Sequence, residues 1–155
     1  MAGWNPWAAA GRLPHLEIWF DDVPEGATWH RHDGRDHITI DASVSRRERS
    51  ALLAHELIHL ERGVGYPWAS TATMEREEAI VRRETARRLV PPPELADLVA
   101  RRSDVEPVTA ALVAEEFDVP EPVAQEALRA LQTLPDGAPD LSRPPSPRVA
   151  RSHRR

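Results

Sequence analysis

Hydrophobic and polar positions divide the chain into a short β-rich region followed by a helical region. Between His15 and about Asp41, the segments HLEIWFDDV, ATWHRH and DHITID are rich in β-branched and aromatic residues. Pro-Glu-Gly and Asp-Gly turn signals separate these segments. The pattern predicts a small antiparallel sheet.

The next segment, SVSRRERSALLAHELIHLERGVG, carries helix signals at both of its ends. Ser45 and Glu48 have the spacing of a capping box, and Gly63 stands where a left-handed cap would end the helix. We therefore expect a helix from about Arg46 to Arg62.

A second helix is predicted for TMEREEAIVRRETARRLV, and it stops at Pro91, Pro92 and Pro93. Residues 94–134 form a smaller helical segment. Within it, VTAALVAEEFDVPEPVAQEALRAL suggests two short helices, with Pro122 near the start of the second.

Length and composition indicate one ordinary domain with additions to it. A chain of 155 residues has enough apolar content for one modest core. We expect a domain at residues 1–93, a small helical extension packed on it at 94–134, and a disordered tail at 135–155. Beyond Asp140 the chain has five Arg, no acidic residue and mostly Pro and Ser, so little of it can be buried.

Composition also limits the cell compartment and the ligand types. The chain has no cysteine, which excludes disulfides and leaves His, Asp and Glu as the metal ligands. No basic head with an apolar run of signal length is present, and no stretch reaches the roughly 18 apolar residues of a membrane span. We expect a cytoplasmic protein with no membrane partner.

The stretch AHELIHLERG in the first predicted helix places two histidines four residues apart. His55 and His59 then lie about 40° apart around the helix and about 6 Å apart along it, so both imidazoles can reach one ion. Glu56 flanks the pair and is placed to hold a water molecule on the metal, as a hydrolytic zinc site requires. Leu53, Leu57 and Leu60 occupy the opposite side and can anchor the helix in the core.

A bare HExxH match is also compatible with a core helix that carries two incidental histidines, so a third ligand decides between the two interpretations. Catalytic zinc usually has three protein ligands. Glu78 shares the inward face of the second predicted helix with apolar residues, whereas Glu77 turns about 100° away and Glu75 lies near the edge. The alternative role of Glu78 is an ion pair with Arg82 at i+4. We favour Glu78 as the ligand, because an inward carboxylate needs a stronger cation than such a pair supplies.

The segment LLAHELIHLERG, followed by a glutamate-bearing helix that ends in ETARRLVPP, resembles the ImmA/IrrE family of small zinc metallopeptidases. The resemblance covers about Leu16 to Leu134. In that family the helix closes with a proline thirteen residues after the ligand glutamate, and counting back from Pro91 leads to Glu78. The chain has Arg82 where the family commonly has Asn or Asp, and Glu84 where it commonly has an aromatic residue.

The resemblance implies an α+β zincin-like fold, Zn²⁺ as cofactor and endopeptidase activity. It implies a protein substrate, a helix-turn-helix repressor of a mobile element or stress locus, cleaved with Glu56 as the base. The alternative is a metal-binding regulatory module that holds such a repressor without cutting it. Retention of Glu56 favours the enzyme, since a binder needs only the histidines. Tyr66 and His37 are candidates for stabilising the oxyanion, with a structural role as the alternative for each.

The two short helices predicted within residues 94–134 also resemble a helix-turn-helix, which raises direct DNA binding as an alternative. Nine acidic residues and three Arg in this segment oppose contact with phosphates. We favour a packing module, with docking of the substrate as a further role, and expect no direct nucleic-acid partner.

Overall fold

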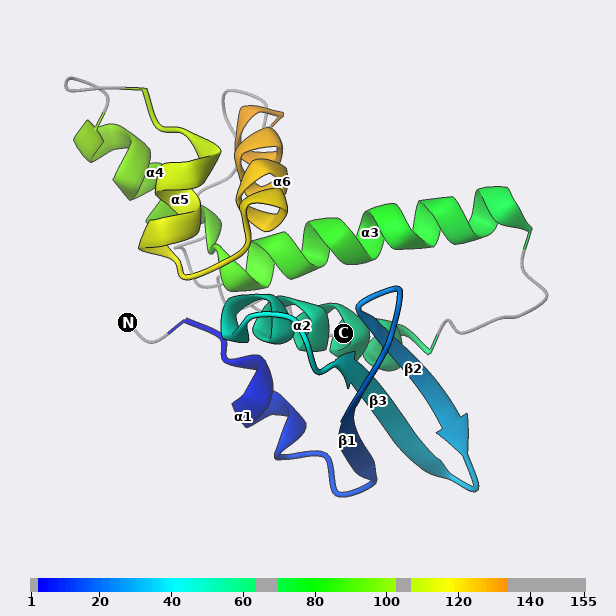
Figure 1. The fold of residues 1–155 in the computed structure, drawn as a ribbon. Helices are drawn as coiled ribbons and strands as arrows, with labels where there is room; N and C mark the ends of the chain where they lie inside the picture. Colours follow the sequence, from blue (N-terminus) through cyan, green and yellow to red (C-terminus); the bar gives the residue numbers. More distant parts are fainter. Residues whose placement is uncertain (1–2, 64–69, 103–106, 134–155) are drawn as a thin grey trace, which may run out of the picture.

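The computed structural model describes residues 3–63, 70–102 and 107–133 (Figure 1). The expected tail at 135–155 lies outside these ranges. In chain order the elements are α1 (Pro6–Ala10), β1 (Leu16–Asp21), β2 (Ala27–His32), β3 (Arg35–Asp41), α2 (Arg46–Arg62), α3 (Thr71–Leu89), α4 (Pro92–Arg102), α5 (Ala110–Glu116) and α6 (Glu121–Gln132). The chain is therefore α+β, with a small three-stranded sheet and helices on one side of it.

The sheet is mixed, with the strand order β1-β3-β2. A two-residue turn with positive φ angles of 50° at Asp33 and 75° at Gly34 joins β2 to β3 as an antiparallel hairpin. The Asp-Gly signal is thus confirmed. The expectation of an all-antiparallel sheet is wrong, because β1 pairs with β3 in parallel, Ile18 beside Ile38.

The reason for the parallel pair is the central position of β3. It pairs with β1 on one side and β2 on the other, and its Ile38 and Ile40 are covered by α2 and 0% exposed. The connection after β1 therefore carries the chain past β3 to the far edge of the sheet. Because β2 then returns in the opposite direction to β1 and is antiparallel to β3, β1 must be parallel to β3.

One face of the sheet is covered by α2, and α3 lies on the other side of α2 (Figure 1). Leu53 and Leu57 of α2 pack against Ile38 and Ile40 in a buried cluster. This packing leaves the opposite side of α2 facing α3. The helix is thus held by apolar contacts on one side while its other side is available for polar side chains.

The ends of α2 and α3 are where local sequence signals place them. The Ser45 hydroxyl and the Glu48 carboxylate form the reciprocal capping box, and Gly63 ends α2 in the left-handed region with φ 65°. Ser70 caps α3, which ends at Leu89 just before the prolines. Both helix predictions are confirmed. The short helix α1, capped by the side chain of Asn5, was not expected.

A second apolar cluster joins the C-terminal end of α3 to α4, α5 and α6. It includes Val90, Leu95 and Val113, all nearly fully buried. The two short helices expected here are α5 and α6, and α4 precedes them. Pro92 and Pro93 form the first turn of α4, where the missing N–H groups of proline are not needed. No helix in the described ranges combines the length and apolar character that membrane crossing requires.

The anchoring of α2 on the sheet predicts a large stability loss for Leu57→Ala. Leu57 is 1% exposed, whereas Leu13 is 37% exposed. We expect Leu57→Ala to lower the free energy of unfolding by about 2–5 kcal/mol, the usual cost of such a cavity. The matched control Leu13→Ala should change it by less than about 1 kcal/mol. Urea unfolding followed by circular dichroism measures both values, and equal losses would contradict this account of the core.

Candidate metal centre

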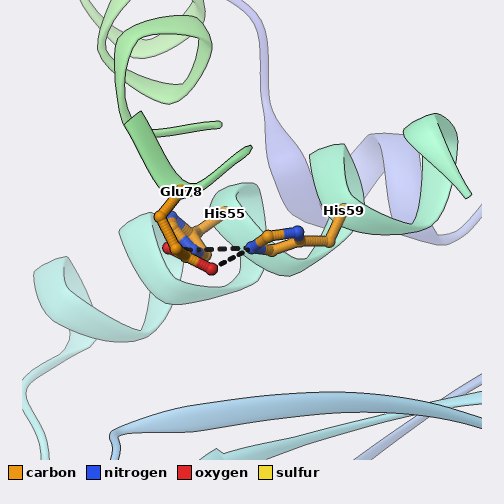
Figure 2. Close-up of side chains that lie close together, drawn as sticks. All are labelled: His55, His59 and Glu78. Atoms are coloured by element: carbon orange, nitrogen blue, oxygen red, sulfur yellow. Dashed lines mark hydrogen bonds and ion pairs between the residues drawn. The ribbon is translucent and has the colours of Figure 1, made fainter. Parts of the chain in front are cut away.

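The structure brings His55, His59 and Glu78 together at the contact between α2 and α3 (Figure 2). The Nε2 atoms of His55 and His59 lie 3.1 Å apart. The Glu78 carboxylate reaches from α3 to both rings, with Oε2 at 3.2 Å from Nε2 of His55 and Oε1 at 3.0 Å from Nε2 of His59. All three side chains therefore present a ligand atom to one shared position.

These distances fit a metal-binding arrangement. One ligand atom from each residue falls within 4.8 Å of the other two. Ligand atoms of a tetrahedral ion with bonds of about 2.0–2.2 Å lie roughly 3.3 Å from one another, so little movement separates this geometry from a coordinated one. The His-His-Glu cluster can hold a divalent metal ion.

The helical phase of α3 explains why Glu78 occupies this position. Val81 and Thr85, on the same face of the helix, are buried. Glu75 is exposed, and Glu77 pairs with Arg62 instead. The alternative ion pair of Glu78 with Arg82 is not formed, since the carboxylate contacts the two histidines.

Burial affects the titration of the site. The His55 ring is largely buried beside His59, and this burial lowers the pKa of His55. Burial thus favours the neutral form of its imidazole. A neutral ring nitrogen is the form that binds a metal ion.

Glu56 lies next to the cluster without joining it. Glu56 is only 9% exposed. Burial, together with the negative charge of Glu78, raises the pKa of Glu56 to about 7. A carboxylate with a pKa in this range can accept and release a proton near neutral pH. Its position beside the ligands is the one expected of a base that acts on a metal-activated water molecule.

The cluster opens into a cleft of about 1150 Å³. The walls of the cleft come from α2, α3, the edge strand β2 with the loop before it, and α6. His55, Glu56, His59 and Glu78 all line it. The side chain of Glu78 is 43% exposed, so the cluster has an open side through which water or a larger ligand can approach.

Two ion pairs hold α3 against α2 close to the cluster. Arg62, at the end of α2, forms two hydrogen bonds to the carboxylate of Glu77, the residue before Glu78. This contact lowers the pKa of Glu77. Farther along, Arg88 of α3 binds Glu61 of α2 through both terminal nitrogens, at 2.9 and 2.7 Å. The sequence prediction missed these pairs, because no local pattern indicates which distant charges will meet.

The remaining sequence candidates lie elsewhere. Glu84 binds Arg87 and Arg88, and hydrogen bonds from these two arginines lower its pKa to about 2. His37 lies on the sheet face opposite α2, stacked on His30 with ring centroids 5.2 Å apart, and is therefore away from the cluster. Tyr66 lies outside the described residues.

Comparisons with known proteins leave the family open. No protein-family model matches the chain, and no curated protein is significantly similar to it. The resemblance to the metallopeptidase family stays a prediction that rests on the quoted motifs.

The cluster predicts that the protein binds one divalent ion through these three side chains. His55→Ala, His59→Ala and Glu78→Gln should each lose the ion after reconstitution with Zn²⁺ at neutral pH, because two remaining ligands hold zinc poorly. Glu75→Gln on the same helix and His30→Ala on the sheet are matched controls that should keep it. Elemental analysis after gel filtration measures the stoichiometry. Loss of zinc from Glu75→Gln with retention in Glu78→Gln would move the third ligand to Glu75.

The Arg62–Glu77 pair predicts a positioning effect on metal affinity. Glu77→Gln and Arg62→Gln should each weaken zinc binding several-fold, because α3 then holds Glu78 less firmly. The double variant should be no weaker than either single variant, as expected for one shared interaction. Competition with a chromogenic chelator measures the affinities. Additive losses would show that the two residues act independently.

Proposed function

We propose that this protein is a zinc-dependent endopeptidase. The observation that carries the proposal is the convergence of His55, His59 and Glu78 from two helices, with Glu56 buried beside them in an open cleft. Three protein ligands with an open side and an adjacent carboxylate are the parts of a hydrolytic metal site.

The donor set supports zinc as the ion. Two imidazole nitrogens and one carboxylate oxygen form one of the common ligand sets of catalytic zinc. The chain has no cysteine, so thiolate sites are excluded. When bound, zinc would act as a Lewis acid that polarises a peptide carbonyl and lowers the pKa of water to about 7.

The protein side chains supply the remaining chemistry. Three side chains would hold the metal ion in a fixed position. They are His55 and His59, on consecutive turns of α2, and Glu78 of α3. Glu56 accepts a proton from the attacking water molecule and donates it to the leaving amine.

The edge of the sheet offers a place for an extended peptide. In the order β1-β3-β2, strand β2 is an edge strand, and its residues Ala27, Thr28 and Trp29 line the cleft together with the metal ligands. An unpaired strand edge can hydrogen-bond an extended chain through main-chain groups. This arrangement supports a polypeptide substrate.

The substrate that we propose is a helix-turn-helix repressor of a mobile element or stress locus. We propose that the protein cleaves it in the cytoplasm. This choice rests on the resemblance of the HExxH helix and the glutamate-bearing helix to the ImmA/IrrE metallopeptidases. Helix α6 supports a role for the C-terminal extension in docking, because Val123 and Gln125 of α6 line the same cleft. The alternative, a module that binds the repressor without cutting it, is tested by the same experiment.

Replacing Glu56 by Gln separates catalysis from metal binding. Glutamine keeps the shape of the side chain but cannot accept a proton. Zinc content should stay at the wild-type value, while cleavage should fall by at least about two orders of magnitude, the scale of losing a positioned base. Cleavage is measured by mass spectrometry on two substrates. One is the helix-turn-helix protein whose gene lies nearest to the gene of this protein, and the other is a proteome-derived peptide library.

The controls for this experiment are a chelator, which should abolish cleavage, and Glu75→Gln, which should cleave as the wild type does. If the wild type binds zinc and the repressor but cuts neither substrate, the regulatory-binder alternative is correct. Equal cleavage by wild type and Glu56→Gln would contradict the role of Glu56 as the base.

A further inference from the structure

One stripe of α3 faces the cleft, and it carries a cation beside the metal ligands. Met74, Glu78, Arg82 and Thr85 all line the cleft. Their spacing of four, four and three residues places them on one face of the helix. Arg82 therefore lies one turn beyond Glu78, about 6 Å farther along the helix axis.

The charge of Arg82 has no partner within the part of the chain that the structure describes. Arg82 makes no hydrogen bond or ion pair with a residue in these ranges, whereas Arg87 and Arg88 of the same helix bind Glu84. Two of the cleft-lining carboxylates are engaged elsewhere, and a third, Glu56, is buried. Glu78 contacts the two histidines, and Glu126 of α6 lies 3.3 Å from Arg129. A guanidinium is thus left available on the wall of the cleft.

Arg82 differs from its exposed neighbour on α3 in where it lies. Arg83, the next residue, is also exposed, but it does not line the cleft. The placement of Arg82, more than its lack of a partner, separates it from an ordinary surface arginine.

We propose that Arg82 binds a carboxylate of the peptide substrate, an inference that rests on the proposed peptidase function. A guanidinium pairs with a carboxylate through two parallel hydrogen bonds, which gives both affinity and orientation. Arg82 lies about 6 Å from Glu78 along the helix axis, and two residues of an extended peptide span a similar length. Arg82 therefore selects substrates with a negative charge within about two residues of the cleaved bond.

The carboxylate has two sources in a peptide. An Asp or Glu side chain near the cleaved bond would make Arg82 a specificity residue of an endopeptidase. A free C-terminal carboxylate would make the protein remove short pieces from the end of a chain. Arg82 binds both through the same chemistry, so the ligands of the experiment must separate them.

The test measures binding to zinc-loaded protein and does not require cleavage. The probes are three mercaptoacetyl dipeptides, whose thiol directs them to the metal. One ends in Ala-Gln-amide and has no carboxylate, one ends in Ala-Glu-amide, and one ends in Ala-Gln with a free carboxylate. Titration calorimetry gives their affinities for the wild type, Arg82→Gln, Arg82→Lys and the matched control Arg83→Gln.

We expect the wild type and Arg83→Gln to bind one or both carboxylate peptides roughly ten- to a hundredfold more tightly than the neutral peptide, the scale of a charge-assisted hydrogen bond. Arg82→Gln should lose this preference while binding the neutral peptide as the wild type does. Arg82→Lys should keep part of it, because lysine retains the charge without the planar fork. The carboxylate peptide that binds more tightly shows whether Arg82 binds an acidic side chain or a free C-terminus.

Three contrary outcomes distinguish failure of the Arg82 inference from failure of the proposed function. If the neutral peptide binds zinc-loaded protein and the wild type shows no preference for a carboxylate, the inference about Arg82 is wrong and the peptidase proposal stands. A preference that persists in both Arg82 variants also overturns it. If the protein binds no zinc, the proposed function fails and the inference fails with it.

Discussion

The site depends on the packing of α3 against α2, because neither helix alone assembles three ligands. This packing places two carboxylates, Glu56 and Glu78, beside two mostly buried imidazoles. Glu56 and the two imidazoles are mostly removed from water, which is costly unless charge compensates for it. The raised pKa of Glu56 reflects this cost directly. A divalent cation between the helices would offset this desolvation cost. These buried side chains are therefore unfavourable in a purely structural contact and favourable in a metal centre.

The helix contact is in turn fixed from both sides. Leu53 and Leu57 hold α2 on the sheet, and the far end of α3 enters the second apolar cluster with α4, α5 and α6. Between these anchors, the Arg62–Glu77 and Arg88–Glu61 pairs connect the two helices directly. The candidate ligands thus belong to regular helices held by packing at two separate cores, which limits their movement more than loop positions would.

Local and helical signals in the sequence were enough to predict much of this arrangement. Caps at Ser45 and Gly63 define α2, and the helical phase of α3 selects Glu78, because both depend on neighbours within a few residues. The strand order could not be predicted, since turn signals mark where the chain reverses and not which strand becomes central. The sequence prediction also missed the contribution of α6 to the cleft and the Arg62–Glu77 pair. They join segments whose proximity only the folded chain determines.

The charges close to the candidate ligands determine what Arg82 would contribute to the cleft. An ionised Glu56 and Glu78 carry two negative charges, which a divalent ion balances. Arg82 then adds one unpaired positive charge on the cleft wall. An acidic residue at this position would instead leave the loaded site with a net negative charge and would repel an anionic substrate. With a divalent ion bound, Arg82 would therefore determine the sign of the charge that a peptide meets on this wall of the cleft.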